Sequence, residues 1–172
     1  MPTSTNDFDA EALYRELLAQ VRAGLQGVQD AAIVGIHSGG AWLAERLAAD
    51  LGMSQRYGSI DVSFYRDDYA RKGLHPDVKP TNIGFNVDRA TIVLVDDVLF
   101  TGRTTRAAIN VLFDFGRPAR IMLAALADRG GRELPVAADF VAIKVTLEQD
   151  QSLALARAAD GTFTLTIEKD HA

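Results

Sequence analysis

The 172-residue sequence contains no cysteine, and this absence excludes disulfide bonds and thiolate-bound metals. Its three histidines, His37, His75 and His171, are scattered, so the sequence predicts no structural zinc site. The chain also lacks a basic and apolar leader and any apolar run near the ~20 residues that span a bilayer, which predicts a cytoplasmic protein with no membrane partner. An excess of positive charge is missing too. The net charge of -5 argues against indiscriminate binding to nucleic acid, although a local basic patch could still recognise a specific RNA.

The spacing of apolar residues predicts one α/β domain over residues 1–172. Helices are expected at 8–24, 41–51 and 104–115, and strands at 31–36, 59–65, 91–95 and 120–127. Because strands alternate with helices up to residue 127, we expect a mostly parallel open sheet flanked by helices, with ligands at the carboxyl ends of its strands. Further strands at 140–145, 153–157 and 162–167, the last two joined at Asp160-Gly161, predict a small β region with a C-terminal hairpin over about 152–168.

Residues 66–84 are predicted to form a long flexible loop. The stretch 66–85 holds two prolines, two glycines and seven charged residues, a composition typical of an exposed functional loop. We expect it to close over bound substrate, excluding water and bringing cations to a leaving group. Arg66 borders the preceding strand and is the catalytic candidate, ahead of Arg71, Lys72 and Lys79. The alternative is a solvated basic surface.

The segment Val93 to Thr105 combines a buried strand, two adjacent acids and a small-residue loop that opens a helix. The loop would present backbone N–H groups and hydroxyls at a helix N-terminus, which suits a terminal phosphate; its residues are Thr101, Gly102, Arg103, Thr104 and Thr105. The carboxylates of Asp96 and Asp97 suit the vicinal hydroxyls of a ribose, so one ligand could span a sugar diol and its 5′-phosphate. For a lone Thr-Gly-x-Thr, a solvated turn with an ordinary helix cap is an equal alternative.

A second small-residue loop, His37-Ser38-Gly39-Gly40, follows the first predicted strand. Small residues let backbone amides approach an anion closely, and the alternative is an ordinary tight turn from strand to helix. Together with the downstream segment, the anion site is the favoured interpretation.

The segment from Val93 resembles the phosphoribosyl-pyrophosphate signature of type I phosphoribosyltransferases. The resemblance implies the fold of those enzymes, with Asp96 and Asp97 on the ribose hydroxyls of 5-phosphoribosyl-1-pyrophosphate (PRPP) and Thr101 to Thr105 around its 5′-phosphate. His37 to Gly40 then occupy the position of the pyrophosphate loop. The catalytic residues implied are Asp97, Asp96 and Arg66.

A wider resemblance, to the PyrR family of bifunctional pyrimidine operon attenuators and uracil phosphoribosyltransferases, covers about residues 30 to 140. It is carried by VSFYRDDYARKG (62 to 73), IVLVDDVLFTGRTTRAAINVLFDFGRPARI (92 to 121) and LADRGGRELPVAADFV (126 to 141). The resemblance implies that Asp128-Arg129-Gly130 lies at the mouth of the base pocket with Arg132 and Glu133, although a plain charged loop is an equal interpretation for the last two.

The resemblance implies transfer of ribose 5-phosphate to uracil, giving UMP and pyrophosphate. Phe100 stands where 6-oxopurine enzymes carry an acid that meets the purine, and phenylalanine neither exchanges a proton nor accepts a hydrogen bond, so transfer to hypoxanthine or guanine is disfavoured. Magnesium is expected as cofactor, held through substrate oxygens and water without direct protein ligands. Homo-oligomeric assembly is also expected.

The alternative function is a regulator that binds messenger RNA of the pyrimidine operon, with UMP and UTP as effectors and little catalysis. Two departures from the family bear on these expectations. The family's Lys-Thr-Arg-Gly is His37-Ser38-Gly39-Gly40 here, which removes two cations from the pyrophosphate loop, and its Gly-Lys-Asn-Ile-Pro-Thr-Ser is AIKVTLE (142–148). The cations that could bind RNA are Arg15, Arg22, Arg132, Lys144 and Arg157.

Overall fold

The computed structural model describes residues 7–63 and 81–170. Most of the predicted loop at 66–84 lies outside these residues, and with it the catalytic candidate Arg66 and the cations Arg71, Lys72 and Lys79. No helix in the described part of the chain is long and apolar enough to span a membrane.

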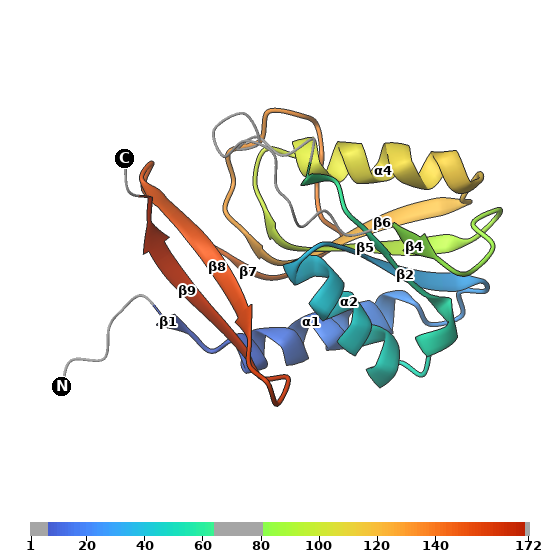
Figure 1. Cartoon of the computed structure of the whole chain (residues 1–172), viewed down its shortest axis with the longest axis horizontal. Coiled ribbons are helices and arrows are strands. Elements are labelled where there is room, and N and C mark those ends of the chain that lie inside the picture. The colour runs from blue at the N-terminus through green and yellow to red at the C-terminus, as the bar shows by residue number, and fades with distance from the viewer. Residues whose placement is uncertain (1–6, 64–80, 171–172) are drawn as a thin grey trace.

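A six-stranded sheet forms the centre of the molecule, in the order β4-β3-β2-β5-β6-β7 (Figure 1). Its strands are β2 (Ala31–Ile36), β3 (Tyr57–Ile60), β4 (Asn82–Ile83), β5 (Thr91–Leu99), β6 (Arg120–Asp128) and β7 (Phe140–Lys144). Only β4 runs antiparallel to its neighbour; the other paired strands of this sheet are parallel. The predicted mostly parallel α/β sheet is therefore confirmed.

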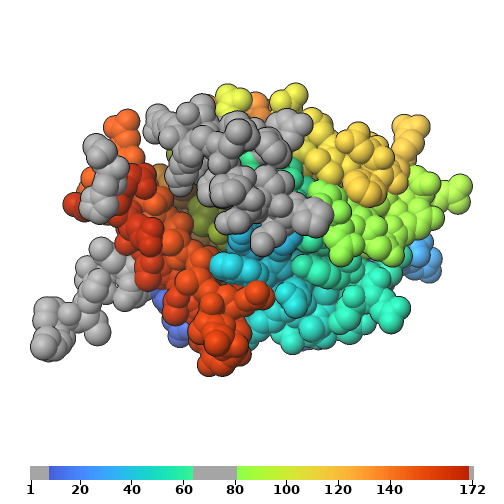
Figure 2. All heavy atoms as spheres, viewed as in Figure 1, coloured from blue at the N-terminus to red at the C-terminus, as the bar shows by residue number. Residues whose placement is uncertain are grey.

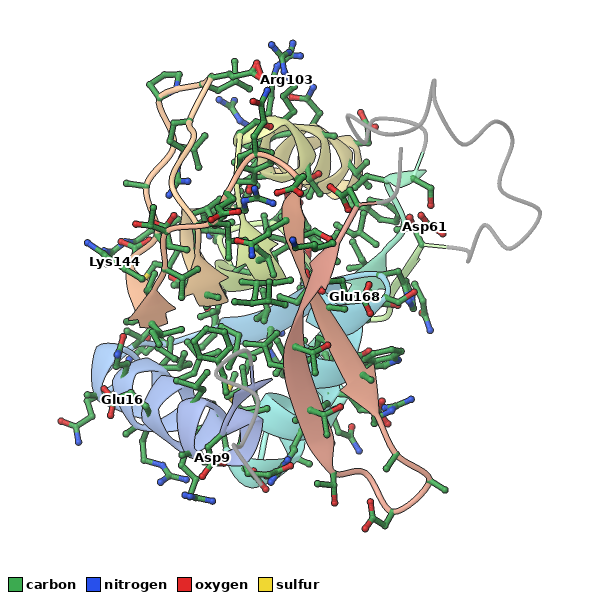
Figure 3. The ribbon with its side chains drawn as sticks, turned by 90° about the vertical axis from the view of Figure 1, so that its left-hand side faces the viewer. Asp9, Glu16, Asp61, Arg103, Lys144 and Glu168 are labelled. Atoms are coloured by element: carbon green, nitrogen blue, oxygen red, sulfur yellow. The ribbon has the colours of Figure 1, made fainter. Side chains whose placement is uncertain are left out.

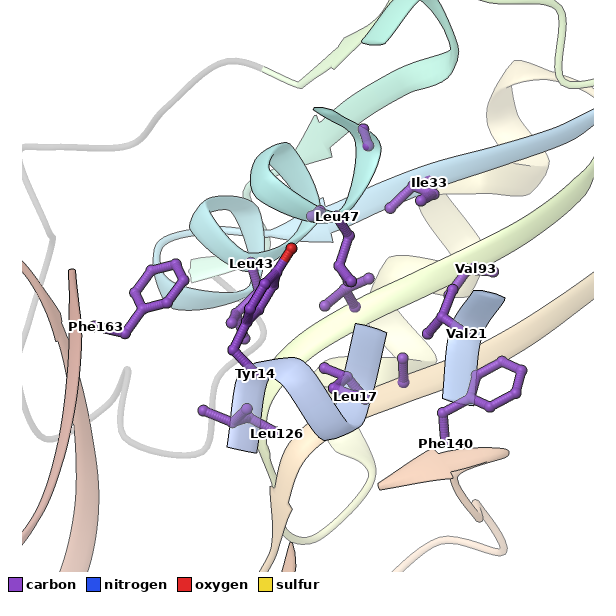
Figure 4. Close-up of a cluster of buried hydrophobic side chains, with 14 of the residues drawn as sticks. Tyr14, Leu17, Val21, Ile33, Leu43, Leu47, Val93, Leu126, Phe140 and Phe163 are labelled. Carbon is purple, nitrogen blue, oxygen red and sulfur yellow. The ribbon is translucent and has the colours of Figure 1, made fainter. Parts of the chain in front are cut away.

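Helices cover both faces of this sheet because its central strands are apolar on both sides. On one face, α1 (Ala10–Gly24) and α2 (Gly39–Asp50) pack on Val93 and Val95 of β5. Figure 4 shows this cluster, including Tyr14 and Leu17 of α1 and Leu43 and Leu47 of α2. On the opposite face, α4 (Arg103–Phe115) packs on the alternate residues of β5. A short 3-10 helix, η1 (Ser54–Arg56), precedes β3 in the chain.

A second, three-stranded antiparallel sheet stands beside the first, in the order β1-β9-β8 (Figure 1). It comprises β1 (Asp7–Phe8), β8 (Gln151–Arg157) and β9 (Phe163–Lys169). The predicted hairpin turn is present, since the amide of Gly161 donates to Ala158 O over 2.9 Å. In Figure 2 the hairpin abuts α2, where Arg157 of β8 lies 3.4 Å from a carboxylate oxygen of Glu45.

The largest differences from the sequence prediction lie at the ends of elements. Phe8 was predicted to be helical, but it pairs with Leu165 in β1, and Asp9 caps α1 by accepting from the amide of Ala12. The predicted strand at 59–65 is β3, which spans 57–60. Strand β5 continues past residue 95 to Leu99, so both aspartates are part of the strand and not of a loop after it.

Candidate active site

Apart from Arg66, which lies outside the described residues, the predicted site residues lie at the carboxyl ends of β2, β5 and β6. The loop 37–40 follows β2, the acid pair lies near the end of β5 and Asp128 closes β6. Figure 3 looks toward this edge of the sheet, with the β8–β9 hairpin in front and Arg103 at the start of α4. Ligands of open α/β sheets bind at such an edge, so the sequence brings its anion loops and acids together where the fold can use them.

The two aspartates lie on opposite sides of β5, because successive side chains of a strand alternate. Asp97 follows the pattern of Val93 and Val95 and lies on the α2 side, whereas Asp96 lies on the α4 side. Asp96 is 7% exposed and accepts from the amide of Asp97 over 2.9 Å, and Asp97 accepts from the amide of Val98 over 2.8 Å. Each carboxylate therefore faces a different loop.

The loop 37–40 lies directly against the acid pair. A Cβ added at Gly39 would stand 2.5 Å from Asp97 Oδ2, and one added at Gly40 would stand 2.4 Å from Val95 O and 2.9 Å from the Asp96 Cα. All these contacts are shorter than real Cβ atoms show; at Gly40 the obstacles are backbone atoms, so glycine is required there, whereas at Gly39 the obstacle is the Asp97 side chain. The His37 amide donates to Ile60 O over 2.8 Å, which ties the loop to the end of β3.

The loop at 101–105 has the features of an anion site at a helix N-terminus. Gly102 adopts a left-handed φ of 93° and gives α4 no side-chain cap, and no acidic residue lies in the first turn. The first amides of a helix have no acceptor within it, so Thr104 and Thr105 can direct their N–H groups at a ligand. The amide of Arg103 donates to Thr101 Oγ1 over 3.2 Å.

Thr105 differs from its neighbours in the predicted phosphate cradle. Its side chain is 2% exposed, and its hydroxyl is buried without a hydrogen-bond partner. A phosphate at the surface would meet the backbone amide of Thr105 and not this hydroxyl. We therefore keep only the amide of Thr105 in the cradle.

The loop after β6 carries the residues expected at the base pocket. Asp128 Oδ1 accepts from the amide of Gly130 over 2.9 Å, and Oδ2 lies 2.6 Å from a terminal nitrogen of Arg132. Burial would raise the pKa of Asp128, but the bonds from Arg132 and Gly130 outweigh burial and hold the pKa below its ordinary value. Asp128 is thus an ionised acceptor in the neutral pH range, and it is already engaged by its own loop.

Phe100 and Arg129 form a stacked pair that the sequence did not reveal. The Arg129 guanidinium carbon lies 4.0 Å from the centroid of the Phe100 ring, and a Cβ on Gly131 would stand 2.5 Å from a ring carbon of Phe100. Phe100 is nevertheless 42% exposed, so one part of the ring faces solvent. Burial lowers the pKa of Arg129, yet a guanidinium stays charged, and its Nε is buried with no hydrogen-bond partner. In the sequence, only the position of Phe100 before the phosphate loop and the turn Arg129-Gly130-Gly131 point toward this contact.

The described residues hold no group of three or more histidine, aspartate or glutamate side chains suited to a metal ion. The donors at the site are the carboxylate oxygens of Asp96 and Asp97, which are hard ligands of the kind magnesium accepts. Magnesium keeps several water and phosphate oxygens as ligands in such sites. A bound pyrophosphate beside the aspartates would therefore suit magnesium without a full set of protein ligands.

Comparison with known proteins identifies the class to which this site belongs. The family model of the phosphoribosyl transferase domain matches residues 5–153. Among solved structures, the purine phosphoribosyltransferase of Pyrococcus horikoshii superposes with a TM-score of 0.62 at 26% identity, over 80% of this chain and 85% of that one. The fold and the class are therefore those of a phosphoribosyltransferase, as predicted.

Curated relatives narrow the class further. The Bifunctional protein PyrR of Ralstonia nicotianae is 51% identical over 170 residues, which cover 96% of this chain and 97% of the relative. That of Pseudomonas aeruginosa (strain LESB58) is 47% identical over 148 residues, 85% of this chain and 86% of the relative. The chain belongs to the PyrR family.

Proposed function

We propose that the protein transfers ribose 5-phosphate from PRPP to uracil, giving UMP and pyrophosphate. The observation that carries this proposal is the close approach of the glycine loop to the acid pair. A Cβ added at Gly39 would stand 2.5 Å from Asp97 Oδ2, and one added at Gly40 would stand 2.4 Å from Val95 O. This contact supports a site in which an anion loop lies beside a sugar-binding acid pair, with the proposed phosphate cradle following on the same strand. PRPP carries these three groups in one molecule.

The reaction needs positioning and electrostatic stabilisation more than a strong base. Displacing pyrophosphate from the anomeric carbon builds positive charge on the ribose and negative charge on the leaving group. Asp97, on the α2 side of β5, is placed to steady the ribose, and the amides of Gly39 and Gly40 to meet pyrophosphate. Magnesium, carried by substrate oxygens and water beside Asp96 and Asp97, supplies neutralising charge for the pyrophosphate. Because both Asp128 oxygens already accept bonds, we assign the uracil N1 proton to water or a backbone carbonyl nearby.

Phe100 supports a pyrimidine substrate. Its ring is fixed between Arg129 and Gly131 and presents an apolar surface where an acid would be needed to bond a purine nitrogen. A flat, half-exposed ring is suited to stack against a base. The solved purine enzyme shares the fold, and the substrate is assigned from this residue and from the family.

The test is release of pyrophosphate from PRPP with magnesium and one of three bases: uracil, hypoxanthine or guanine. We expect turnover with uracil and none above background with the purines. Turnover with a purine alone would refute the proposed substrate. If none of the three bases supported turnover in a preparation that binds UMP, the proposed catalysis would be refuted.

A second function, RNA-dependent regulation, is favoured by the name of the curated relatives, which are bifunctional. Of the predicted RNA-binding cations, several are engaged within the protein: Arg22, Arg132 and Arg157. Arg15 and Lys144 are exposed. A gel shift with pyrimidine-operon leader RNA at two salt concentrations tests this function, because binding through phosphates weakens steeply with salt. No shift at low salt with UMP present would exclude it.

We also propose that the protein self-associates, and the apolar surface of α4 supports this. Phe113 and Phe115 are 52% and 49% exposed, unusual for large apolar side chains. Sedimentation of the wild type and of Phe113→Ser would show whether a dimer or larger assembly forms and whether this helix contributes. An unchanged assembly in the variant would place the interface elsewhere.

A further inference from the structure

Arg132 makes more polar contacts than any surface role requires. Its guanidinium donates from Nε to Val136 O over 2.8 Å, from one terminal nitrogen to Phe100 O over 2.7 Å, and from the other to Asp128 Oδ2 over 2.6 Å. The ion pair with Asp128 is mostly buried, with about a quarter or less of either side chain exposed. A plain charged loop, the alternative interpretation of this residue, would not hold a guanidinium in this way.

These contacts cross from one binding loop to another. Asp128 ends β6 and Val136 belongs to the loop after it, where we place the base, whereas Phe100 immediately precedes the phosphate loop. Because a guanidinium is planar and rigid, three acceptors held at once are fixed relative to one another. A lysine ammonium in this place would keep the charge but not the fork that reaches all three.

Backbone bonds run along the same boundary. The Arg129 amide donates to Leu99 O over 3.0 Å, and Thr101 O accepts from the amides of Glu133 and Leu134 over 2.9 and 3.1 Å. A Cβ on Gly102 would stand 3.2 Å from the side chain of Val136. The base loop and the phosphate loop therefore contact each other at several points, and Arg132, which bonds residues on both sides of this boundary, is less exposed than the Arg103–Glu133 ion pair that also crosses it.

We propose that Arg132 is a positioning residue that sets the base loop at a fixed distance from the phosphate loop, so that one nucleotide can fill both. The proposal rests on the proposed function. UMP spans the two loops, whereas ribose 5-phosphate fills only the phosphate loop. The extra affinity of UMP over ribose 5-phosphate thus measures how well the base loop is held in its position relative to the phosphate loop.

The test is calorimetric binding of UMP and of ribose 5-phosphate to the wild type and to Arg132→Lys and Arg132→Ala. Since misplacement by about 1 Å costs on the order of 100-fold at a preorganised site, we expect the UMP preference to shrink by roughly 10- to 100-fold in both variants. Affinity for ribose 5-phosphate should change by no more than about threefold, because the α4 amides are intact. Millimolar guanidinium should restore part of the UMP preference to Arg132→Ala but not to Arg132→Lys, whose side chain fills the space.

Glu45→Gln is the matched control. Glu45 of α2 lies outside both loops and makes an exposed ion pair, 3.4 Å from Arg157 of β8, with 64% and 37% of the two side chains exposed. Such a pair contributes little, so the variant should keep the UMP preference of the wild type. Thermal unfolding of each variant separates loss of register from loss of fold, since an unfolded fraction lowers the affinity of both ligands equally.

The outcomes are distinguishable. A wild type that binds UMP no better than ribose 5-phosphate would refute the proposed function itself. A wild type that prefers UMP, with Arg132→Lys and Arg132→Ala keeping the same preference, would overturn the role of Arg132 and leave the function standing. Equal losses for both ligands would also overturn it, because they indicate general destabilisation.

Discussion

Gly40→Ala tests whether the approach of the glycine loop to β5 is needed for the reaction. The added methyl would stand 2.4 Å from Val95 O and 3.1 Å from the Val95 carbonyl carbon, both backbone atoms of a central strand that cannot turn aside. To regain an ordinary contact of 3.4 Å the loop must retreat by about 1 Å. Such a shift at a site that orients a reacting group costs on the order of 100-fold in kcat/KM. Overpacking should also lower the free energy of unfolding by about 1–3 kcal/mol.

The control is Gly24→Ala, at the end of α1, where the added methyl would meet the first residue of β7 and neither of the proposed anion loops. A Cβ there would stand 2.4 Å from the Phe140 ring, so the variant is also overpacked, but the obstacle is a side chain that can shift. Initial rates of pyrophosphate release over a range of uracil and PRPP concentrations give kcat/KM for both variants, and thermal unfolding is measured alongside. We expect both to melt earlier and only Gly40→Ala to lose activity. If Gly40→Ala kept wild-type kcat/KM, the glycine loop would not be part of the active site.

Three other substitutions have definite expected outcomes. Asp97→Asn should lower kcat by at least roughly 10-fold with little change in melting temperature, because it removes charge facing the ribose; full turnover would refute this role. Phe100→Ala should raise KM for uracil several-fold without raising KM for PRPP, since it removes the ring held by Arg129; equal increases for both substrates would count against a base-stacking role. Tyr14→Phe should cost about 1 kcal/mol in the free energy of unfolding at pH 7, as the hydroxyl donates to Asp50 over 2.5 Å. Burial, and then Asp50, raise the pKa of Tyr14 far above its ordinary value, so this stabilisation is complete below about pH 10 and is lost as pH rises further. Urea titrations at pH 8 and 11 should show a larger loss in the wild type than in Tyr14→Phe, because burial also raises the pKa of Tyr57, which both proteins contain.

Much of the fold follows from local patterns that the sequence displays openly. The alternation of apolar strands with helices predicts the parallel sheet, and Asp160-Gly161 predicts the hairpin turn that the structure contains. The assignment of Phe8 to a helix failed because its partner, Leu165, lies more than a hundred residues away, and periodicity within a window of a dozen residues carries no information on such pairing.

The site divides in the same manner. The residues of the acid pair and of both anion loops are recognisable because their chemistry is contiguous in the chain, and strand topology then places them at one edge. The Arg129–Phe100 stack and the bond from Arg132 to Phe100 O were not predicted, since each joins residues about thirty positions apart whose types are common on any surface. A charged loop and a positioning device have the same composition, and only the distances distinguish them.

Removal of magnesium should weaken the binding of PRPP and leave the binding of UMP nearly unchanged. Asp97 brings a carboxylate to the loop His37 to Gly40, where PRPP would add a pyrophosphate, and this loop carries no permanently charged side chain. Without a divalent cation this repulsion should weaken PRPP binding at least roughly 10-fold. UMP has no pyrophosphate, and its single phosphate meets the amides at the start of α4, so its affinity should change by less than about twofold in EDTA. Calorimetry with both ligands, with and without magnesium, decides the matter: equal losses for UMP and PRPP would mean that the cation supports the protein and not the pyrophosphate.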